Sequence, residues 1–272
     1  MNVHDRIRWR ANTARRFPAV WGASLALAAM ASGCAMSYRT PGPGASFRSL
    51  GVTDEDVEQG TDFAIGRRLE RKPLAAFPAH IAIVRVQGGG YYSHSSRSYG
   101  RGNFSVVTTR DVESDAAFEC LAALPAIRGL APLNRLVISE YLNDEEDLRQ
   151  AAASVQADML LIYTFDTVFD VEEKIAPLSF VTLGLFPDDE ARVTSTVSAA
   201  LLDTRNGYVY GLAEATSHQT QLANNWTSRA AVDQSRRRAE QEAFDRLVEN
   251  LAVMWDRVVR EYAPAEGTVA AG

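Results

Sequence analysis

The sequence predicts an α/β (α+β) fold, in which a small mixed sheet ends in an antiparallel hairpin and packs against two or three helices and a long C-terminal helix. Three observations support this prediction. Residues 159–165 (MLLIYTF) are apolar without alternation, which is typical of a central strand buried on both faces. The pair Asn206-Gly207 separates two strand-like segments, and both residue types adopt positive φ at low cost. Apolar side chains recur at helical spacing over residues 243–259.

The first half of the domain is predicted to alternate short strands with a helix. Residues 81–86 (IAIVRV) are rich in strand-forming side chains, and residues 104–108 form a second short strand. An apolar helix pattern covers residues 112–124 and ends before a proline. A brief strand is expected around Leu130.

A second helix is predicted just before the central strand. Asn143, with Glu146 three residues later, resembles a capping box, which satisfies free amide donors at the start of a helix. Apolar side chains then recur on one face, at Leu148, Ala151, Ala152 and Val155.

The second half of the domain is predicted to consist of a hairpin and a helix. Residues 166–191 form a long connection, residues 193–202 form a strand, and residues 208–216 return as its partner. The last element is a helix over residues 228–262, whose first half is charged on most faces.

The N-terminus has the features of a bacterial export signal. Five arginines lie before residue 17, fourteen mostly apolar residues follow at 17–30, and Ala31-Ser32-Gly33 precedes Cys34. The apolar stretch is shorter than the roughly 20 residues that a membrane span needs. A plain secretory signal or a single membrane anchor is the alternative interpretation.

Small residues directly before a cysteine resemble the lipobox of bacterial lipoproteins, although Ala31 stands where leucine is commoner. The resemblance implies that Cys34 carries a thioether-linked diacylglycerol and that its amine, freed by cleavage, is acylated. Ala35 in place of aspartate implies, by resemblance to enterobacterial sorting, the periplasmic face of the outer membrane.

These features divide the chain into four expected parts. Residues 1–33 form the signal peptide, and residues 34–73 form the lipidated cysteine with a flexible tether or lead-in, which contains a Pro-Gly-Pro-Gly stretch. Residues 74–263 form a single periplasmic domain, and residues 264–272 form a tail.

The charge balance argues against nucleic acid as a partner. The chain has 28 basic and 34 acidic residues, and without residues 1–33 the counts become 23 and 33, a balance of −10. Nucleic-acid binding depends on clustered positive charge, which such a balance disfavours.

A loop rich in Gly, Ser, Tyr and Arg is predicted over residues 88–103. Tyrosine and arginine suit protein interfaces because they combine a large contact area with a polar tip. The candidate partner contacts are Tyr91, Tyr92, Arg97, Tyr99 and Arg101. A loop without a partner explains the composition equally well. Because no Gly-Lys-Ser/Thr follows the glycines at 88–90, a nucleotide-phosphate loop is not predicted.

The sequence contains no catalytic or metal-binding motif. His80, His94 and His218 are not at metal-ligand spacing, and neither a Gly-x-Ser-x-Gly elbow nor a calcium loop is present. Cys120 lies in an apolar helix pattern, which predicts a buried structural thiol. We therefore expect no cofactor, no metal and no enzymatic activity.

Two connections between predicted elements follow a pattern found in some lipoproteins. Residues 148–163 lead from a helix through Ala157-Asp158 into the central strand, and residues 201–210 join two strands through Asp203-x-x-x-Gly207. Behind a lipobox, residues 78–262 resemble the periplasmic domain of curli-secretion (CsgG-type) lipoproteins and of the lipoprotein activators of penicillin-binding proteins. The resemblance implies a binding role rather than catalysis.

The sequence thus predicts a lipid-anchored lipoprotein that binds or recruits another component of the cell envelope. Its expected partners are the membrane, through acylated Cys34, and an unidentified envelope protein. Each buried methylene of an acyl chain contributes about 0.8 kcal/mol, so several chains would hold the protein permanently. The alternatives are a homo-oligomeric assembly or secretion subunit, and an envelope hydrolase with a site built from scattered carboxylates.

Overall fold

The computed structural model describes residues 44–45, 61–93, 95–172, 190–222 and 229–264. The chain divides into two units, Met1–Met36 and Ser37–Gly272, and every described residue belongs to the second unit. The expected signal peptide, Cys34 and most of the expected tail lie outside the described residues.

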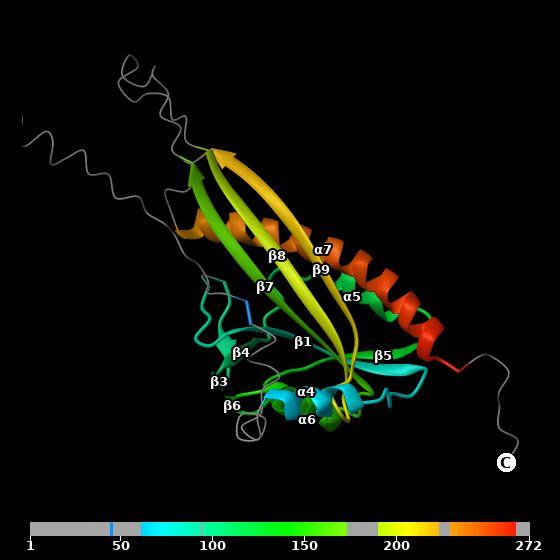
Figure 1. Ribbon diagram of the computed structural model, residues 1–272. Helices are drawn as coiled ribbons and strands as arrows, with labels where there is room; N and C mark the ends of the chain where they lie inside the picture. The colour runs from blue at the N-terminus through cyan, green and yellow to red at the C-terminus, as the bar shows by residue number, and fades with distance from the viewer. Residues whose placement is uncertain (1–43, 46–60, 94, 173–189, 223–228, 265–272) are drawn as a thin grey trace, which may run out of the picture. The chain divides into compact units, whose positions relative to one another are not determined.

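The described part of the chain contains four helices and nine strands (Figure 1). The helices are α4 (Thr61–Glu70), α5 (Asp115–Ala122), α6 (Glu145–Ser154) and α7 (Arg229–Tyr262). The strands are β1 (Ala79–Gly88), β2 (Ser98–Tyr99), β3 (Arg101–Gly102), β4 (Phe104–Val107), β5 (Ile127–Pro132), β6 (Tyr141–Leu142), β7 (Met159–Glu172), β8 (Glu190–Asp203) and β9 (Val209–Leu222). None of these described helices is both long enough and apolar enough to cross a membrane.

Seven strands form one mixed sheet in the order β2-β4-β1-β7-β8-β9, and β5 pairs with the first half of β1. Strand β1 is parallel to β5 and β7 and antiparallel to β4, whereas β7, β8 and β9 form an antiparallel meander. Strands β3 and β6 pair separately. The predicted mixed α/β fold, with its hairpin and long last helix, is confirmed.

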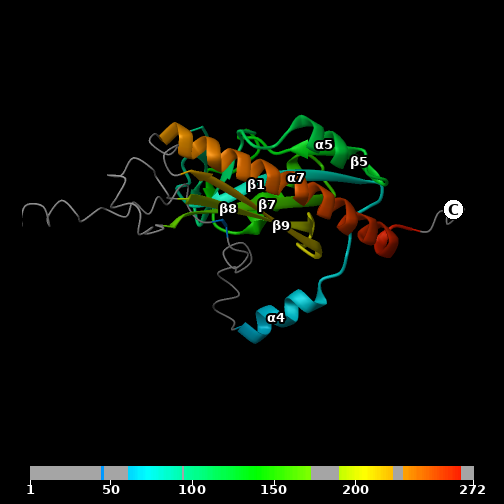
Figure 2. The same cartoon turned by 90° about the horizontal axis from the view of Figure 1, so that it is seen from above.

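Helices lie on both sides of the sheet, with α5 and α7 on one side and α4 on the other (Figure 2). An apolar cluster under α5 and α7 includes Phe165, Leu201, Phe244, Leu247 and Trp255. A second cluster, on the opposite face, includes Leu148, Ala151 and Ala152 of α6 with Leu160, Ile162 and Leu202 of the sheet. The first part of β7 is therefore buried on both faces, as its apolar run predicts.

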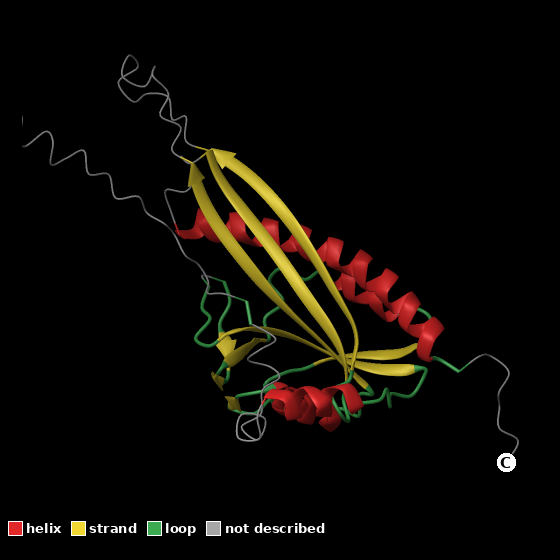
Figure 3. Ribbon diagram, in the orientation of Figure 1, coloured by secondary structure: helices red, strands yellow, loops and turns green. Residues whose placement is uncertain are grey.

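The three long strands extend further than the sequence predicts (Figure 3). Strand β7 continues to Glu172, although its apolar run ends at Phe165, and both β8 and β9 are longer at the same end. Beyond Phe165 the side chains alternate between buried and exposed: Thr167 is buried, and Val168 is 56% exposed. One face of this part of the sheet contacts α7 and the other meets solvent, so the pattern becomes two-fold.

The start of α6 lies one residue later than predicted. Asp144 is the N-cap, and its carboxylate accepts hydrogen bonds from the backbone N–H groups of Glu146 and Asp147. The Asp147 carboxylate in turn accepts from the backbone N–H of Asp144, so these two aspartates form the capping box. The predicted pair Asn143 and Glu146 is wrong. A carboxylate at this position is favoured because it also interacts with the helix dipole.

The thiol of Cys120 is exposed on α5 and free, so the prediction of a buried structural thiol is wrong. Helix α5 starts at the N-cap Ser114 and buries Ala117 and Leu121, which are four residues apart on one face. Cys120 lies about 100° around the helix from Leu121 and therefore outside the packed face.

Candidate functional site

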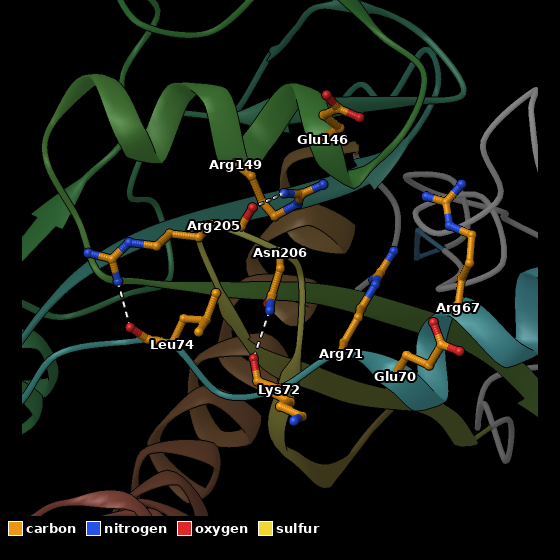
Figure 4. Close-up of a pocket in the computed structure, with 9 residues that line it drawn as sticks. All are labelled: Arg67, Glu70, Arg71, Lys72, Leu74, Glu146, Arg149, Arg205 and Asn206. Carbon is orange, nitrogen blue, oxygen red and sulfur yellow. Dashed lines mark hydrogen bonds between the residues drawn. The ribbon is translucent and has the colours of Figure 1, made fainter.

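A basic groove with a cavity volume of about 620 Å³ lies between α4, the first turns of α6 and the β8–β9 turn (Figure 4). Its lining residues are Arg67, Glu70, Arg71, Lys72, Leu74, Glu146, Arg149, Arg205 and Asn206. Five of them are basic and two are acidic, although the chain as a whole is acidic. The basic groove is therefore a local concentration of positive charge.

One wall of the basic groove is the segment that follows α4, and the base of the hairpin holds it in place. The backbone N–H of Leu74 donates to the Asp203 carboxylate at 2.7 Å, and that of Ala75 donates to the Tyr210 hydroxyl at 3.0 Å. The Tyr210 hydroxyl donates to Asp203 at 2.9 Å. Burial raises the pKa of Tyr210, and the Asp203 carboxylate raises it further, so the hydroxyl stays protonated.

Side chains of the β8–β9 turn also donate hydrogen bonds to backbone carbonyls of the same segment (Figure 4). The Arg205 guanidinium donates to the Leu74 carbonyl at 2.6 Å, and the Asn206 amide donates to the Lys72 carbonyl at 2.7 Å. Arg71 donates to the Gly207 carbonyl at 3.3 Å. The groove wall is thus connected to the sheet by hydrogen bonds in both directions.

Gly207 lets these groups approach the turn. Its φ of +70° lies in the left-handed region, which glycine adopts without strain. A Cβ at this position would lie 3.0 Å from the Arg71 guanidinium and 3.2 Å from a Glu145 carboxylate oxygen. A larger residue would therefore strain the turn and crowd the basic groove.

Arg149, on α6, is held at the floor of the basic groove by the turn. One of its terminal nitrogens donates to the carbonyls of Thr204 at 3.4 Å and Arg205 at 3.2 Å. Its Nε is buried and has no hydrogen-bond partner among the described residues. The guanidinium is therefore fixed in place with donor capacity left over.

Glu145 is the carboxylate between Arg71 and Arg149, and it satisfies neither. One oxygen lies 3.8 Å from a nitrogen of each arginine, which is too far for a hydrogen bond, and the other oxygen has no partner among the described residues. Burial raises the pKa of Glu145, against the effect of the two arginines. Burial also lowers the pKa of Arg71; Glu145 opposes this, whereas Arg149 lowers it further. Positive charge is incompletely compensated here.

The arrangement can hold an anionic group by charge-assisted hydrogen bonds from several segments. Single motifs do not reveal the groove because residues 67–74 and 205–206 meet only in the folded chain. The available signal was the run Arg67-Arg68-Leu69-Glu70-Arg71-Lys72, which carries four basic side chains in six residues.

Among the residues predicted to contact a partner, Tyr91 is not at the surface. It is 4% exposed, and its hydroxyl accepts a hydrogen bond from Arg85 at 3.1 Å. The structure therefore assigns its side chain to the interior. The predicted lipidation residue, Cys34, lies outside the described residues.

Of the other four predicted contact residues, Tyr99 and Arg101 lie in short strands, and Tyr92 and Arg97 lie outside the named strands. Tyr92 is 62% exposed and forms an isolated bridge with Arg97, which is also exposed. Tyr99 of β2 is half-buried, whereas Arg101 of β3 is exposed, with its Nε 3.6 Å from a Glu140 carboxylate oxygen. A partner contact at these four residues stays a prediction.

A buried ionic network lies beneath the first half of α7. It consists of two arginines and four carboxylates: Arg85, Arg236, Asp111, Glu113, Asp233 and Glu240. Arg85 lies 3.1 Å from Asp111 and 3.2 Å from Glu240, and Arg236 also contacts Glu240. Burial raises the pKa of Glu240 against the effect of both arginines. Because all six side chains are buried, we interpret the network as structural.

Metal ligation finds no support in the described residues, which hold no cluster of three His, Cys, Asp or Glu side chains suited to an ion. The histidines have local partners instead. A ring nitrogen of His80 lies 3.3 Å from the Gln156 carbonyl, and one of His218 lies 3.0 Å from the Thr194 hydroxyl.

Comparison with known proteins gives no family, since no family model and no curated protein matches the sequence. Among solved structures, the chain is similar to protein XCC0632 of Xanthomonas campestris, of family-model DUF330, with 14% identity, a TM-score of 0.35, and coverage of 70% of this chain and 94% of that one. It is also similar to lipoprotein GNA1162 of Neisseria meningitidis, with 16% identity, a TM-score of 0.26, and coverage of 61% and 99%. Similarity this low supports no statement about the site, and the narrower resemblance to the CsgG-type group stays a prediction.

Proposed function

We propose that this protein is a lipid-anchored component of the bacterial cell envelope that binds or recruits another envelope component through its basic groove. The observation that carries the proposal is the set of five basic side chains, contributed by three separate segments, in an otherwise acidic chain. The proposed role is recognition and involves no catalysis by the chain.

The path of the chain supports a link between anchor and groove. Cys34, in its lipobox-like setting, would attach the chain to the periplasmic face of the outer membrane. The groove wall at residues 71–75 is the first part of the chain after α4 and is fixed to the hairpin. A tethered groove has a raised effective concentration near other membrane-associated partners.

The anchor is tested by expressing the full chain in a Gram-negative host, with and without Cys34→Ala. We expect a lipid mass increment and outer-membrane sedimentation for the natural sequence, and neither for the variant. An unmodified protein of full mass would contradict the lipoprotein assignment.

The groove is tested in the same cells with a photo-crosslinking residue at Glu146, on the groove, and at Glu119, an exposed glutamate on α5. We expect a discrete adduct with an envelope component from position 146 and none from position 119. The adduct should disappear when Arg67 and Lys72 are both replaced by glutamate. Equal adducts from both positions would show that the groove is not the contact surface.

A further inference from the structure

We infer that the basic groove binds a phosphate group, held between Arg149 of α6 and Arg71 after α4, with Arg67 and Lys72 completing its positive surroundings. The inference rests on the use of the groove proposed above and names the chemistry of the bound group. It applies to free phosphate and to the phosphate of a lipid headgroup alike.

The first support is the pre-organised donor on Arg149. The carbonyls of Thr204 and Arg205 occupy one terminal nitrogen and fix the plane of the guanidinium. Its Nε is buried without a partner in the described part of the chain, and the second terminal nitrogen is 3.8 Å from Glu145. Buried donors are normally satisfied, so the unpartnered Nε–H of Arg149 indicates an acceptor that is supplied from outside.

The second support is the charge around Glu145. This one buried carboxylate faces two arginines at 3.8 Å, and neither distance is a hydrogen bond. The two acidic side chains of the lining, Glu70 and Glu146, are exposed, so water screens their charge. An anion between Arg71 and Arg149 would neutralise the positive charge that Glu145 neutralises only in part.

The third support is the direction of the donors. Arg67 comes from α4, Arg71 from the segment after it, and Arg149 from α6, and Figure 4 shows the first two extending toward α6. A planar carboxylate is matched by the fork of a single guanidinium, whereas a tetrahedral phosphate accepts hydrogen bonds from several directions. Donors that approach from both α6 and the chain around the end of α4 therefore fit phosphate better than carboxylate.

The test uses the full chain purified in detergent from a Gram-negative host, titrated with inorganic phosphate, glycerophosphoglycerol, acetate or chloride at constant ionic strength. Hydrogen exchange is followed at residues 67–75 and 203–208. We expect protection by inorganic phosphate or by the lipid-headgroup analogue, and none by acetate or chloride. A response to inorganic phosphate assigns the site to free phosphate, and a response to glycerophosphoglycerol alone assigns it to a lipid headgroup.

Two variants separate binding from folding. Arg149→Lys keeps the charge but loses the guanidinium fork, and it should weaken the apparent affinity about tenfold or more, which corresponds to about 1.4 kcal/mol. Arg257→Lys, at an exposed position of α7, should leave the affinity unchanged. Exchange of the sheet outside the groove should be the same in both variants.

Equal protection by all four anions, or protection by acetate alone, would overturn the inference. So would an unchanged affinity for phosphate in Arg149→Lys. The two proposals are distinguishable: an adduct that still forms at position 146 in a protein that no phosphate compound protects would overturn the phosphate inference and leave the proposed function standing.

Discussion

The side chain of Gln87 continues the backbone ladder where β1 and β7 separate. The last paired residues of these parallel strands are Arg85 and Tyr163. Two residues further along, the Gln87 amide donates to the Phe165 carbonyl at 3.0 Å and accepts from the Phe165 N–H at 2.8 Å. The buried Gln87 amide thus provides both the donor and the acceptor that a paired strand residue would offer to the backbone of Phe165.

We expect Gln87→Leu to destabilise the domain by about 2–4 kcal/mol, because it leaves a buried N–H and a buried C=O of Phe165 unsatisfied. Chemical denaturation measures the loss. The matched control is Gln150→Leu at an exposed position of α6, which should change the free energy of unfolding by less than about 0.5 kcal/mol. Equal losses in both variants would contradict the assigned role.

Asp111 should contribute acid-sensitive stability. Burial alone would raise its pKa, but Arg85 and Arg236 outweigh burial and lower the pKa to about 2. A carboxyl group whose pKa is lower in the folded state stabilises the fold above its unfolded pKa of about 4, and this contribution is lost as the pH falls through about 2.

At pH 6 we therefore expect Asp111→Asn to lower the free energy of unfolding by about 2 kcal/mol, the size of a charge-assisted hydrogen bond. The difference from the natural sequence should narrow as the pH falls from about 4 toward about 2. Urea unfolding followed by circular dichroism at each pH measures it. Asp115→Asn, at an exposed position of α5, is the control, and a pH-independent difference for Asp111→Asn would refute the assignment.

At the scale of elements, α7 protects the open edge of the sheet. Strand β9 is the last strand of the described sheet, and an unprotected edge of 14 residues would invite pairing with another chain. The Asn250 amide donates to the Glu214 carbonyl at 2.8 Å, and Arg246 donates to the Thr216 carbonyl at 2.7 Å. These bonds disfavour oligomerisation by strand pairing along β9.

Replacing both residues, in Arg246→Ala with Asn250→Ala, should free these carbonyls and raise self-association. Light scattering after size exclusion should show an average mass that grows with protein concentration. Arg257→Ala, at an exposed position of the same helix, should stay at the mass of the natural sequence. A concentration-independent mass for the double variant would show that the edge is protected by other means.

Local patterns predicted the centres of the elements but not their ends. The apolar run of β7 and the Asn206-Gly207 turn are signals within a few residues, and both were placed correctly. The extension of β7 to Glu172 depends on α7, which follows more than 50 residues later, and on solvent at the opposite face. No short window contains that information.

At the scale of the whole molecule, the two apolar clusters share one sheet. Phe244 of α7 and Leu148 of α6 lie in different clusters, on opposite faces, and both are fully buried. We expect Phe244→Ala to cost about 3–5 kcal/mol and Leu148→Ala about 2–5 kcal/mol, each shifting one cooperative transition.

Urea unfolding followed by circular dichroism and by tryptophan fluorescence should give coincident curves for both variants, since Trp255 is itself buried in the first cluster. Val253→Ala, at an exposed position of α7, should have little effect. A biphasic curve in which each variant moves a different phase would contradict shared cooperativity.

The basic groove is a property of the whole fold because no single helix, strand or turn contains all of its lining. The hydrogen bonds that form it join residues 131 and 134 positions apart, Leu74 with Arg205 and Lys72 with Asn206. The residue pair Asn206-Gly207 predicts the turn, but no local pattern places residues 67–74 beside it. The buried ionic network was missed for the same reason, since Arg85 and Glu240 are 155 residues apart.

The fastening of residues 71–75 to the hairpin has a mechanical consequence. If Cys34 is held in the membrane, a pull on the domain would first reach the hydrogen bond from the Ala45 N–H to the Thr164 hydroxyl of β7, at 2.8 Å. It would then reach the Leu74 and Ala75 hydrogen bonds before it reached β1. Once the Ala45 hydrogen bond is broken, tension would open one wall of the groove before it acted on β1. A group bound in the groove would resist that opening. Tension on the anchor would therefore weaken binding in the groove, and binding would raise the force needed to open it.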